Sequence, residues 1–140
     1  MELVVDTNVL FALPRSSRVR KLVDRLLERK VRLLIPQFVI DELVALKGDV
    51  MKYTGFDEEE FARFLEDVKV LFEVIPEKEY RLFLGEAKRV APHEKDIPLF
   101  ALSLKFNCPV WSREPRLRRQ KVVEVLSDKE VEELLKKSSI

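Results

Sequence analysis

Two stretches of the sequence place a carboxylate beside small polar residues where an apolar run ends. In "ELVVDTNVLF", the apolar residues stop at Asp6-Thr7-Asn8 and then resume. In "CPVWSREPRL", the run ends at Ser112-Arg113-Glu114. Polar residues at such a point form either an ordinary turn, for which Thr7 is well suited, or the mouth of a site. A site requires further carboxylates from other segments of the chain.

Two acids elsewhere could supply them. In "QFVIDELVAL", Glu42 lies four residues after Phe38 and four before Leu46, so the helical period directs it along the apolar stripe. An inward glutamate is costly unless it is paired or binds a cation. Asp96 directly precedes the apolar segment "IPLFALSLKF", where aspartate is also a favoured helix N-cap. Each acid therefore has a structural alternative, a salt bridge for Glu42 and a cap for Asp96.

Asp6, Glu42, Asp96 and Glu114 make a chemically coherent set if they converge in one crevice. Carboxylates that converge repel one another, and a bound divalent cation relieves the repulsion. Mg²⁺ or Mn²⁺ held by such oxygens lowers the pKa of a bound water and stabilises phosphoryl oxygens during an in-line displacement. A zinc site is not expected, because the chain has one histidine and one cysteine. The set predicts metal-assisted hydrolysis of a phosphodiester.

Two basic segments fit a polyanionic substrate. They are "RSSRVRKLVDRLLERK" at residues 15–30 and "REPRLRRQK" at residues 113–121. Because the net charge is only +1, no overall basic field attracts nucleic acid. Each segment taken alone is better explained as a solvated helix face. If the acids form a nuclease site, the side chains expected to contact RNA are Arg15, Arg18, Arg113 and Arg116.

The segments that must position these residues alternate between strands and helices. Short apolar strands separated by helices predict an α/β fold, a three-layer α/β/α sandwich with a parallel sheet of about five strands. Ligands bind such sheets beyond the carboxyl ends of the strands, where both polar stretches fall. The expected strands are residues 2–6, 32–35, 72–75, 108–112 and 122–126, and the expected helices are 16–30, 37–53, 57–71, 77–91, 96–106, 115–120 and 127–137.

The composition sets the broad class. With 140 residues, of which 46% are hydrophobic, residues 1–140 are expected to form a single domain. We expect no membrane span and no secretory signal, and the single Cys108 fits a reducing cytoplasm. Charged residues make up 36% and only three glycines occur, a pattern often seen in proteins from hot habitats. Phe61, Phe64, Phe72 and Phe83 are expected in the core rather than at an interface.

The order of "VVDTNVLF", "VIDELVAL" and "EKDIPLFALSLKFNCPVWSREPRL" resembles the PIN domain family over essentially the whole chain. The resemblance implies a parallel five-stranded sheet between helices and Mg²⁺- or Mn²⁺-dependent ribonuclease activity. Many single-domain members are toxins of the VapC kind, commonly homodimers that a small antitoxin holds inactive. Carried over by position, the family's acids are Asp6, Glu42 and Asp96, with Asn8 and Ser112 as polar support.

The chain departs from the family pattern at Glu114, where the usual residue is aspartate. The longer side chain, and Arg113 beside it as a candidate ion-pair partner, put the second metal position in doubt. The chief alternative is a PIN-like module that binds RNA or protein without cutting. A phosphotransfer enzyme of the haloacid dehalogenase type is disfavoured because Asn8 stands where its second aspartate is needed. Toxin and RNA-processing roles share one site, so the residues leave both open.

Overall fold

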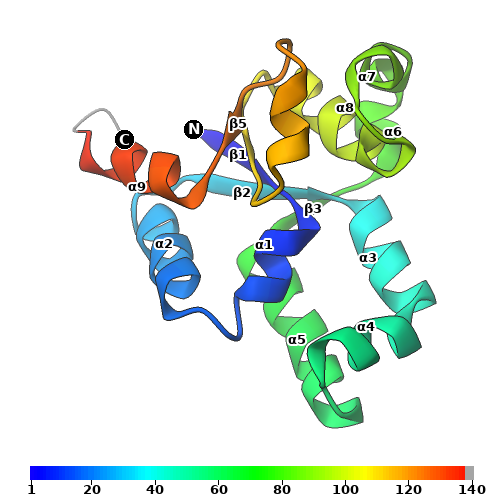
Figure 1. The fold of residues 1–140 in the computed structure, drawn as a ribbon, viewed down its shortest axis with the longest axis vertical. Helices are drawn as coiled ribbons and strands as arrows, with labels where there is room; N and C mark the ends of the chain where they lie inside the picture. The colour runs from blue at the N-terminus through cyan, green and yellow to red at the C-terminus, as the bar shows by residue number, and fades with distance from the viewer. Residues whose placement is uncertain (138–140) are drawn as a thin grey trace.

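The computed structural model describes residues 1–137, and Figure 1 shows their arrangement. Five strands form one sheet in the order β3-β2-β1-β4-β5, and every neighbouring pair is parallel. All five expected strands are therefore present, although β4 and β5 are shorter than expected. Their bounds are Glu2–Val5 for β1, Arg32–Pro36 for β2, Glu73–Ile75 for β3, Val110–Trp111 for β4 and Val125–Leu126 for β5.

The central strand is β1, and the chain changes direction beside it. From β1 it passes outward through β2 to β3, then crosses back to place β4 on the other side of β1. In open parallel sheets, a crevice for ligands opens at this switch point, beyond the carboxyl ends of the strands. Val5 pairs with Trp111 across β1 and β4, so the residues that follow them, Asp6 and Ser112, leave the sheet side by side.

Helices cover both faces of the sheet (Figure 1). On one face lie α1 (Thr7–Ala12), α2 (Ser17–Glu28), α3 (Gln37–Ala45), α4 (Lys47–Thr54), α5 (Glu58–Leu71) and α9 (Asp128–Lys136). On the other lie α6 (Glu77–Tyr80), α7 (Leu84–Val90), α8 (Ile97–Phe106) and the 3-10 helix η3 (Pro115–Arg119), with the short 3-10 turns η1 (Arg81–Phe83) and η2 (Glu94–Asp96) between them.

The strand side chains alternate between two apolar cores, one on each face. Leu3 and Val5 belong to the core that contains Phe61 and Phe64 of α5, whereas Val4 belongs to the core formed with α8. The α/β/α sandwich is thereby confirmed. The expected core phenylalanines on α5 are buried, as is Phe72, and Phe83 is partly buried against the second core.

One helix was not expected, and two expected helices are interrupted. Of the two alternatives for Asp6-Thr7-Asn8, the ordinary turn is excluded, because Thr7 begins helix α1 directly after β1. The helix expected over residues 37–53 is broken at Leu46, whose φ of -104° and ψ of 26° end the α3 ladder, and α4 then turns away from α3 (Figure 1). The helix expected over residues 77–91 is interrupted by the 3-10 turn η1. Buried residues precede and follow each break, so tertiary packing overrides the local helical period.

Within residues 1–137, no helix combines the length and apolar character that crossing a membrane requires. That residues 1–140 constitute a single domain stays a prediction, and residues 138–140 of that range lie outside the described part of the chain. An origin in a hot habitat likewise stays a prediction.

Candidate active site

Asp6 leaves the sheet at the carboxyl end of β1 and is held in place by two hydrogen bonds. One carboxylate oxygen, Oδ1, accepts from the backbone N–H of Thr7 at 2.8 Å. The other, Oδ2, accepts from the hydroxyl of Ser112 at 2.7 Å. Because Ser112 follows β4, the neighbouring strand, the parallel pairing of β1 and β4 itself brings these two groups together.

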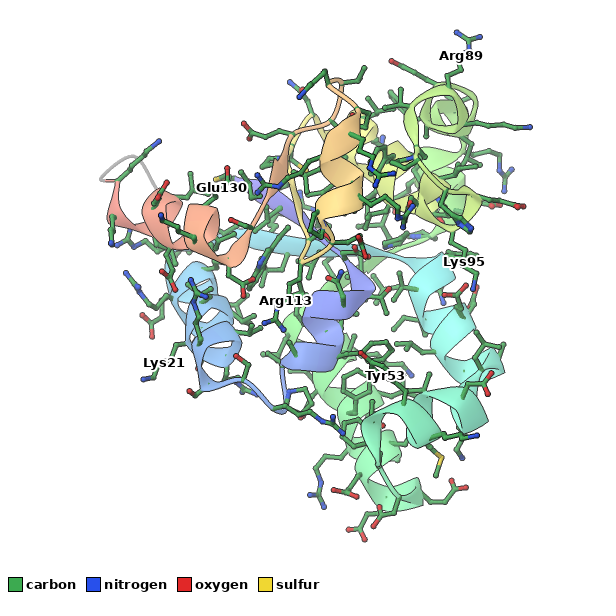
Figure 2. The ribbon with its side chains drawn as sticks, in the orientation of Figure 1. Lys21, Tyr53, Arg89, Lys95, Arg113 and Glu130 are labelled. Carbon is green, nitrogen blue, oxygen red and sulfur yellow. The ribbon has the colours of Figure 1, made fainter. Side chains whose placement is uncertain are left out.

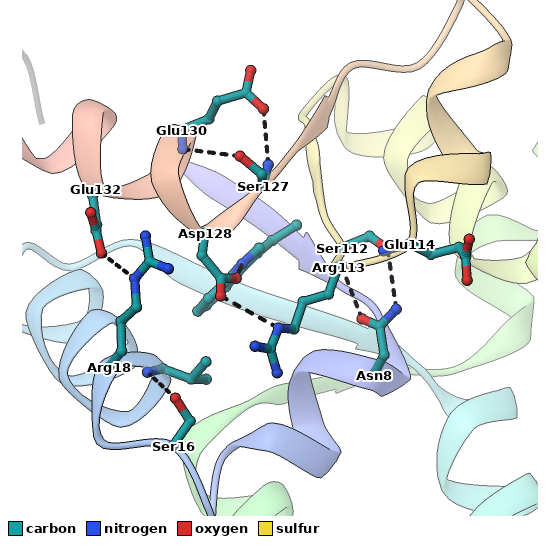
Figure 3. A network of polar contacts seen from close by, with 12 residues as sticks. Asn8, Ser16, Arg18, Ser112, Arg113, Glu114, Ser127, Asp128, Glu130 and Glu132 are labelled. Carbon is teal, nitrogen blue, oxygen red and sulfur yellow. Dashed lines mark hydrogen bonds and ion pairs between the residues drawn. The ribbon is translucent and has the colours of Figure 1, made fainter.

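Ser112 is the centre of a small hydrogen-bonded network. Its side chain is almost fully buried. Besides donating to Asp6, the Ser112 Oγ accepts from the Asn8 side-chain amide at 3.4 Å and from the backbone N–H of Glu114 at 3.0 Å. Asn8 Oδ1 in turn accepts from the backbone N–H of Arg113 at 3.2 Å (Figure 3). The network joins the start of α1 to the loop after β4 and restrains the Asp6 carboxylate.

Asp96 does not cap helix α8, in contrast to the expected structural alternative. Its backbone is helical and its side chain makes no capping hydrogen bond, because η2 leads directly into α8. The carboxylate instead accepts from Arg116 Nη1 at 3.2 Å. The Asp96 side chain is 12% exposed and that of Arg116 36%. Asp96 therefore has no capping role, and the guanidinium of Arg116 neutralises its charge.

Glu114 precedes the 3-10 helix η3 and caps it, because its Oε1 accepts from the backbone N–H of Arg116 at 3.2 Å. Arg113 does not pair with it. Arg113 instead points away from Glu114 and forms an ion pair of 3.4 Å with Asp128 on α9 (Figure 3). Asp128 also accepts from the buried indole N–H of Trp111 at 2.9 Å. The concern that Arg113 would neutralise Glu114 is thus removed by the fold.

A cleft at the switch point brings three of the four predicted acids together. Glu42 is not among its lining residues; it is partly exposed on α3 and lines an adjoining hollow that shares Thr7, Phe11 and Tyr53 with the cleft. Glu42 therefore does not project into the core. The cleft is lined by Asp6, Thr7, Asn8, Phe11, Tyr53, His93, Lys95, Asp96, Glu114 and Arg116.

The environment of Asp6 favours its neutral form. Burial raises the pKa of its carboxyl above the ordinary value of 3.8, and the negative charges of Asp96 and Glu114 raise it further. The hydrogen bonds from Ser112 and Thr7 act in the opposite direction and lower the pKa. A partly desolvated carboxylate that faces two others is the arrangement that a bound cation would stabilise.

The donor chemistry of the cleft fits a hard cation, because Asp6, Asp96 and Glu114 offer carboxylate oxygens, which such cations prefer as ligands. The arrangement of those donors is less complete. In the part of the chain that the structure describes, no three acidic, histidine or cysteine side chains are close enough to hold a metal ion together. Arg116 engages Asp96, and Glu42 lies in the adjoining hollow.

The four arginines expected to contact RNA are dispersed. Of these, Arg116 lines the cleft, whereas Arg113 is held by Asp128. Arg18 on α2 forms an ion pair with Glu132 of α9 (Figure 3), and Arg15 lies over the ring of Phe56 at 5.9 Å.

Sequence reasoning missed four cleft residues, which are Phe11, Tyr53, His93 and Lys95. Lys95 directly precedes Asp96 and could have been noted from that position. Nothing in the local sequence connects Tyr53 to Asp6, because α4 reaches the cleft only through the break at Leu46. Figure 2 shows Tyr53 close to α1, on the same side of the molecule as Lys95.

Without metal, Asp6→Asn is expected to raise the stability of the protein at neutral pH. Because the folded-state pKa of Asp6 is raised, ionising this group costs stability at pH values above that pKa, and the cost vanishes below the ordinary value of 3.8. Urea unfolding in EDTA should therefore show a higher midpoint for the variant at pH 7, with the difference narrowing as the pH falls toward 4. Asp24→Asn, at an exposed position on α2, is the control. A pH-independent difference, or a lower midpoint at pH 7, would contradict a raised pKa for Asp6.

Comparison with known proteins finds a family match and similar folds that each span most of the chain. The family model described as PIN domain matches residues 4–135. No curated protein matches the sequence. Among solved structures, VapBC2 from Rickettsia felis, bound to a promoter DNA fragment, has a TM-score of 0.70 at 14% identity, covering 91% of this chain and 98% of that one.

Two further structures show the same fold. PAE2754 from Pyrobaculum aerophilum has a TM-score of 0.62 at 18% identity, covering 96% of this chain and 87% of that one. VapBC-1 from nontypeable Haemophilus influenzae has a TM-score of 0.61 at 17% identity, covering 92% and 99%. At these identities, the likeness concerns the arrangement of the backbone.

Proposed function

Because the chain belongs to the PIN domain family, we propose that it is an endoribonuclease that hydrolyses RNA phosphodiester bonds with Mg²⁺ or Mn²⁺. The observation that carries the proposal is the cleft beyond β1 and β4, where the partly buried Asp6 lies with Asp96 and Glu114. Nuclease activity of this kind needs carboxylates gathered at one point, and the fold brings three of them to the switch point of the sheet.

Asp6, Asp96 and Glu114 would hold the cation, with Glu42 approaching from the adjoining hollow. When bound, the cation lowers the pKa of a water molecule and offsets negative charge on the phosphoryl oxygens. Ser112 orients the Asp6 carboxylate, and Asn8 holds Ser112 and the loop after β4. Lys95 and Arg116 supply positive charge for the RNA backbone at the edge of the cleft.

The proposal is tested by incubating a panel of labelled RNAs with the protein in Mg²⁺, in Mn²⁺ and in EDTA. Cleavage that requires either cation supports it, and substitutions of the cleft residues assign their roles. If RNA stays intact under every condition while an unrelated ribonuclease cuts the same panel, the enzymatic proposal is wrong.

Arg116→Ala is expected to tighten Mn²⁺ binding by about fivefold and to weaken RNA hydrolysis. The Arg116 guanidinium is hydrogen-bonded to Asp96 and would compete with a cation for that carboxylate, so its removal frees a ligand while it also removes a contact for phosphate. Binding is measured by the loss of the free Mn²⁺ signal in electron paramagnetic resonance. Arg118→Ala, whose side chain pairs with Glu130 rather than with a cleft residue, is the control. Unchanged or weaker Mn²⁺ binding in Arg116→Ala would show that the ion pair does not occupy the cation position.

A second candidate function is a PIN-like module that binds RNA or protein without cutting. The Arg116–Asp96 ion pair favours it, because this pair neutralises one of the carboxylates that a cation would need. RNA binding in gel-shift assays, with no cleavage in any cation, would identify this second function.

The proposed biological role is that of a toxin held inactive by a small antitoxin. VapBC2 and VapBC-1, whose structures resemble this chain, support it by their fold. A short antitoxin reading frame directly upstream, and growth arrest on expression, would support the toxin role over RNA processing.

We further propose that the protein is a homodimer and that it is cytoplasmic. The single cysteine is consistent with the cytoplasmic location. Sedimentation that shows only a 16.5 kDa species at micromolar concentration would contradict the dimer.

A further inference from the structure

We propose that Tyr53 is a stacking platform for a nucleobase of the bound RNA, an inference that rests on the proposed function. Tyr53 lies near the end of α4 and is 74% exposed. Exposure of a large aromatic side chain to water forgoes the free energy that its burial would contribute. A ring that remains exposed beside a charged cleft is therefore available to a ligand.

The ring is supported from behind. Its centroid lies 5.6 Å from that of Phe11 on α1, with an interplanar angle of 50°. Phe11 packs in turn on Phe64 of α5, with centroids 6.1 Å apart, and Phe64 belongs to the buried core. This aromatic series restrains Tyr53 while most of its surface stays open, so little conformational entropy remains to be lost when a base stacks on it.

The position of Tyr53 suits a nucleobase next to the reacting phosphate. Tyr53 lines the same cleft as Asp6 and Asp96, and Lys95 and Arg116 provide positive charge in that cleft. Single-stranded nucleic acid is bound by this combination, in which cations contact the backbone and aromatic rings stack on the bases. Stacking accepts every base because each has a π face, so Tyr53 would hold the strand in place rather than read its sequence.

A protein partner is the competing occupant. Leu46 and Val44 are also exposed, and Leu46 lines the adjoining hollow with Tyr53. The charged lining of the cleft favours RNA, because an apolar protein surface would leave the charges of Asp96, Lys95 and Arg116 without water or counterions.

Binding is measured by fluorescence anisotropy in the Asp6→Asn background, so that RNA is held without being cut. The probes are short labelled single-stranded RNAs that together contain every dinucleotide. Tyr53→Ala is expected to weaken binding by about 5- to 150-fold, and Tyr53→Phe, which keeps the ring, should bind nearly as well as tyrosine. Leu82→Ala, at an exposed apolar residue outside the cleft, is the control and should change nothing.

A scan of abasic positions through the tightest-binding RNA separates stacking from a general loss of affinity. At one position, removal of the base should lower the RNA affinity of the protein that retains Tyr53. The same removal should leave the already lower affinity of Tyr53→Ala unchanged. This non-additive result is expected only if the ring and that base are in contact.

Additive effects at every position, or unchanged RNA binding by Tyr53→Ala, would overturn the stacking proposal. If Tyr53→Ala also altered the sedimentation of the protein, the ring would belong to a protein interface instead. If the protein with Tyr53 intact neither bound nor cut any RNA, the proposed function would fail together with this inference. Cleavage by the wild-type protein without coupling at Tyr53 would overturn this inference alone.

Discussion

Asp6→Asn is expected to lower the rate of metal-dependent RNA hydrolysis by more than about 100-fold while leaving the fold intact. Asp6 is the acid that the sheet itself positions, at the carboxyl end of the central strand and directly beside Ser112. Asparagine keeps the shape and an acceptor oxygen but removes the negative charge that a cation requires. The measurement is initial cleavage rate in Mn²⁺ on an RNA that the wild-type protein cuts.

The matched control for Asp6→Asn is Asp41→Asn, which makes the same change at an exposed residue of α3, one position before Glu42. It should cleave at the wild-type rate. Circular dichroism and urea unfolding establish that Asp6→Asn is folded. Should Asp6→Asn cleave as fast as the wild-type protein, Asp6 would have no part in the reaction, and any activity would come from another site or from a contaminant.

Ser112→Ala is expected to lower the cleavage rate by about 10- to 100-fold, the usual range when the partner of a metal-binding carboxylate is lost. The Ser112 hydroxyl donates to Asp6 and accepts from Asn8 and Glu114, so its removal frees both the carboxylate and the loop that carries Glu114. The hydrogen bond from Ser112 lowers the pKa of Asp6. Without it, the loss of activity on acidification should begin at a higher pH than in the wild-type protein.

Ser103→Ala is the matched control for Ser112→Ala. Ser103 is equally buried, and its hydroxyl donates to the carbonyl of Cys108, away from the cleft. It should lower stability without moving the pH profile of cleavage. A Ser112→Ala profile that keeps its acid limb while only the maximal rate falls would mean that Ser112 positions the loop but does not influence the ionisation of Asp6.

The competition between Arg116 and a cation for Asp96 links the nuclease to the module that binds RNA without cutting. The ion pair offsets part of the repulsion among the carboxylates that line the cleft. A cation that displaced Arg116 would release its guanidinium to face the phosphate. Nuclease activity and passive RNA binding would then differ in the partner of Asp96. The Mn²⁺ measurement on Arg116→Ala tests whether the ion pair occupies the cation position, and the cleavage and gel-shift assays distinguish the two functions.

Most of the fold was predictable from local patterns. The β-branched run before Asp6, the alternating strands and helices, and the spacing of apolar residues on α2 and α5 are properties of short segments. The failures were also local. Leu46 ends α3 although the helical period continues through it, because packing of α4 against the core outweighs the intrinsic preference of a few residues. The helix α1 was missed because its first residues are polar and follow a strand without a loop.

For the site, the sequence by itself determined the chemical types, which are several carboxylates, a serine and an asparagine after strands, and nearby arginines. These choices depend on the identity of each residue and on its place in a strand or helix. The parallel order of short strands also implied that Asp6 and Ser112 would lie at one edge of the sheet, since strand ends in such sheets share a side.

Only the tertiary structure decided which side chains meet. It paired Asp96 with Arg116, sent Arg113 to Asp128, and set Glu42 in the adjoining hollow. It also brought Tyr53 to the cleft through the break between α3 and α4. The physical reason is that each such contact joins segments distant in sequence, and its geometry depends on how the helices pack on the sheet. Local periodicity determines where strands and helices form, whereas tertiary packing determines which partner each charged group has.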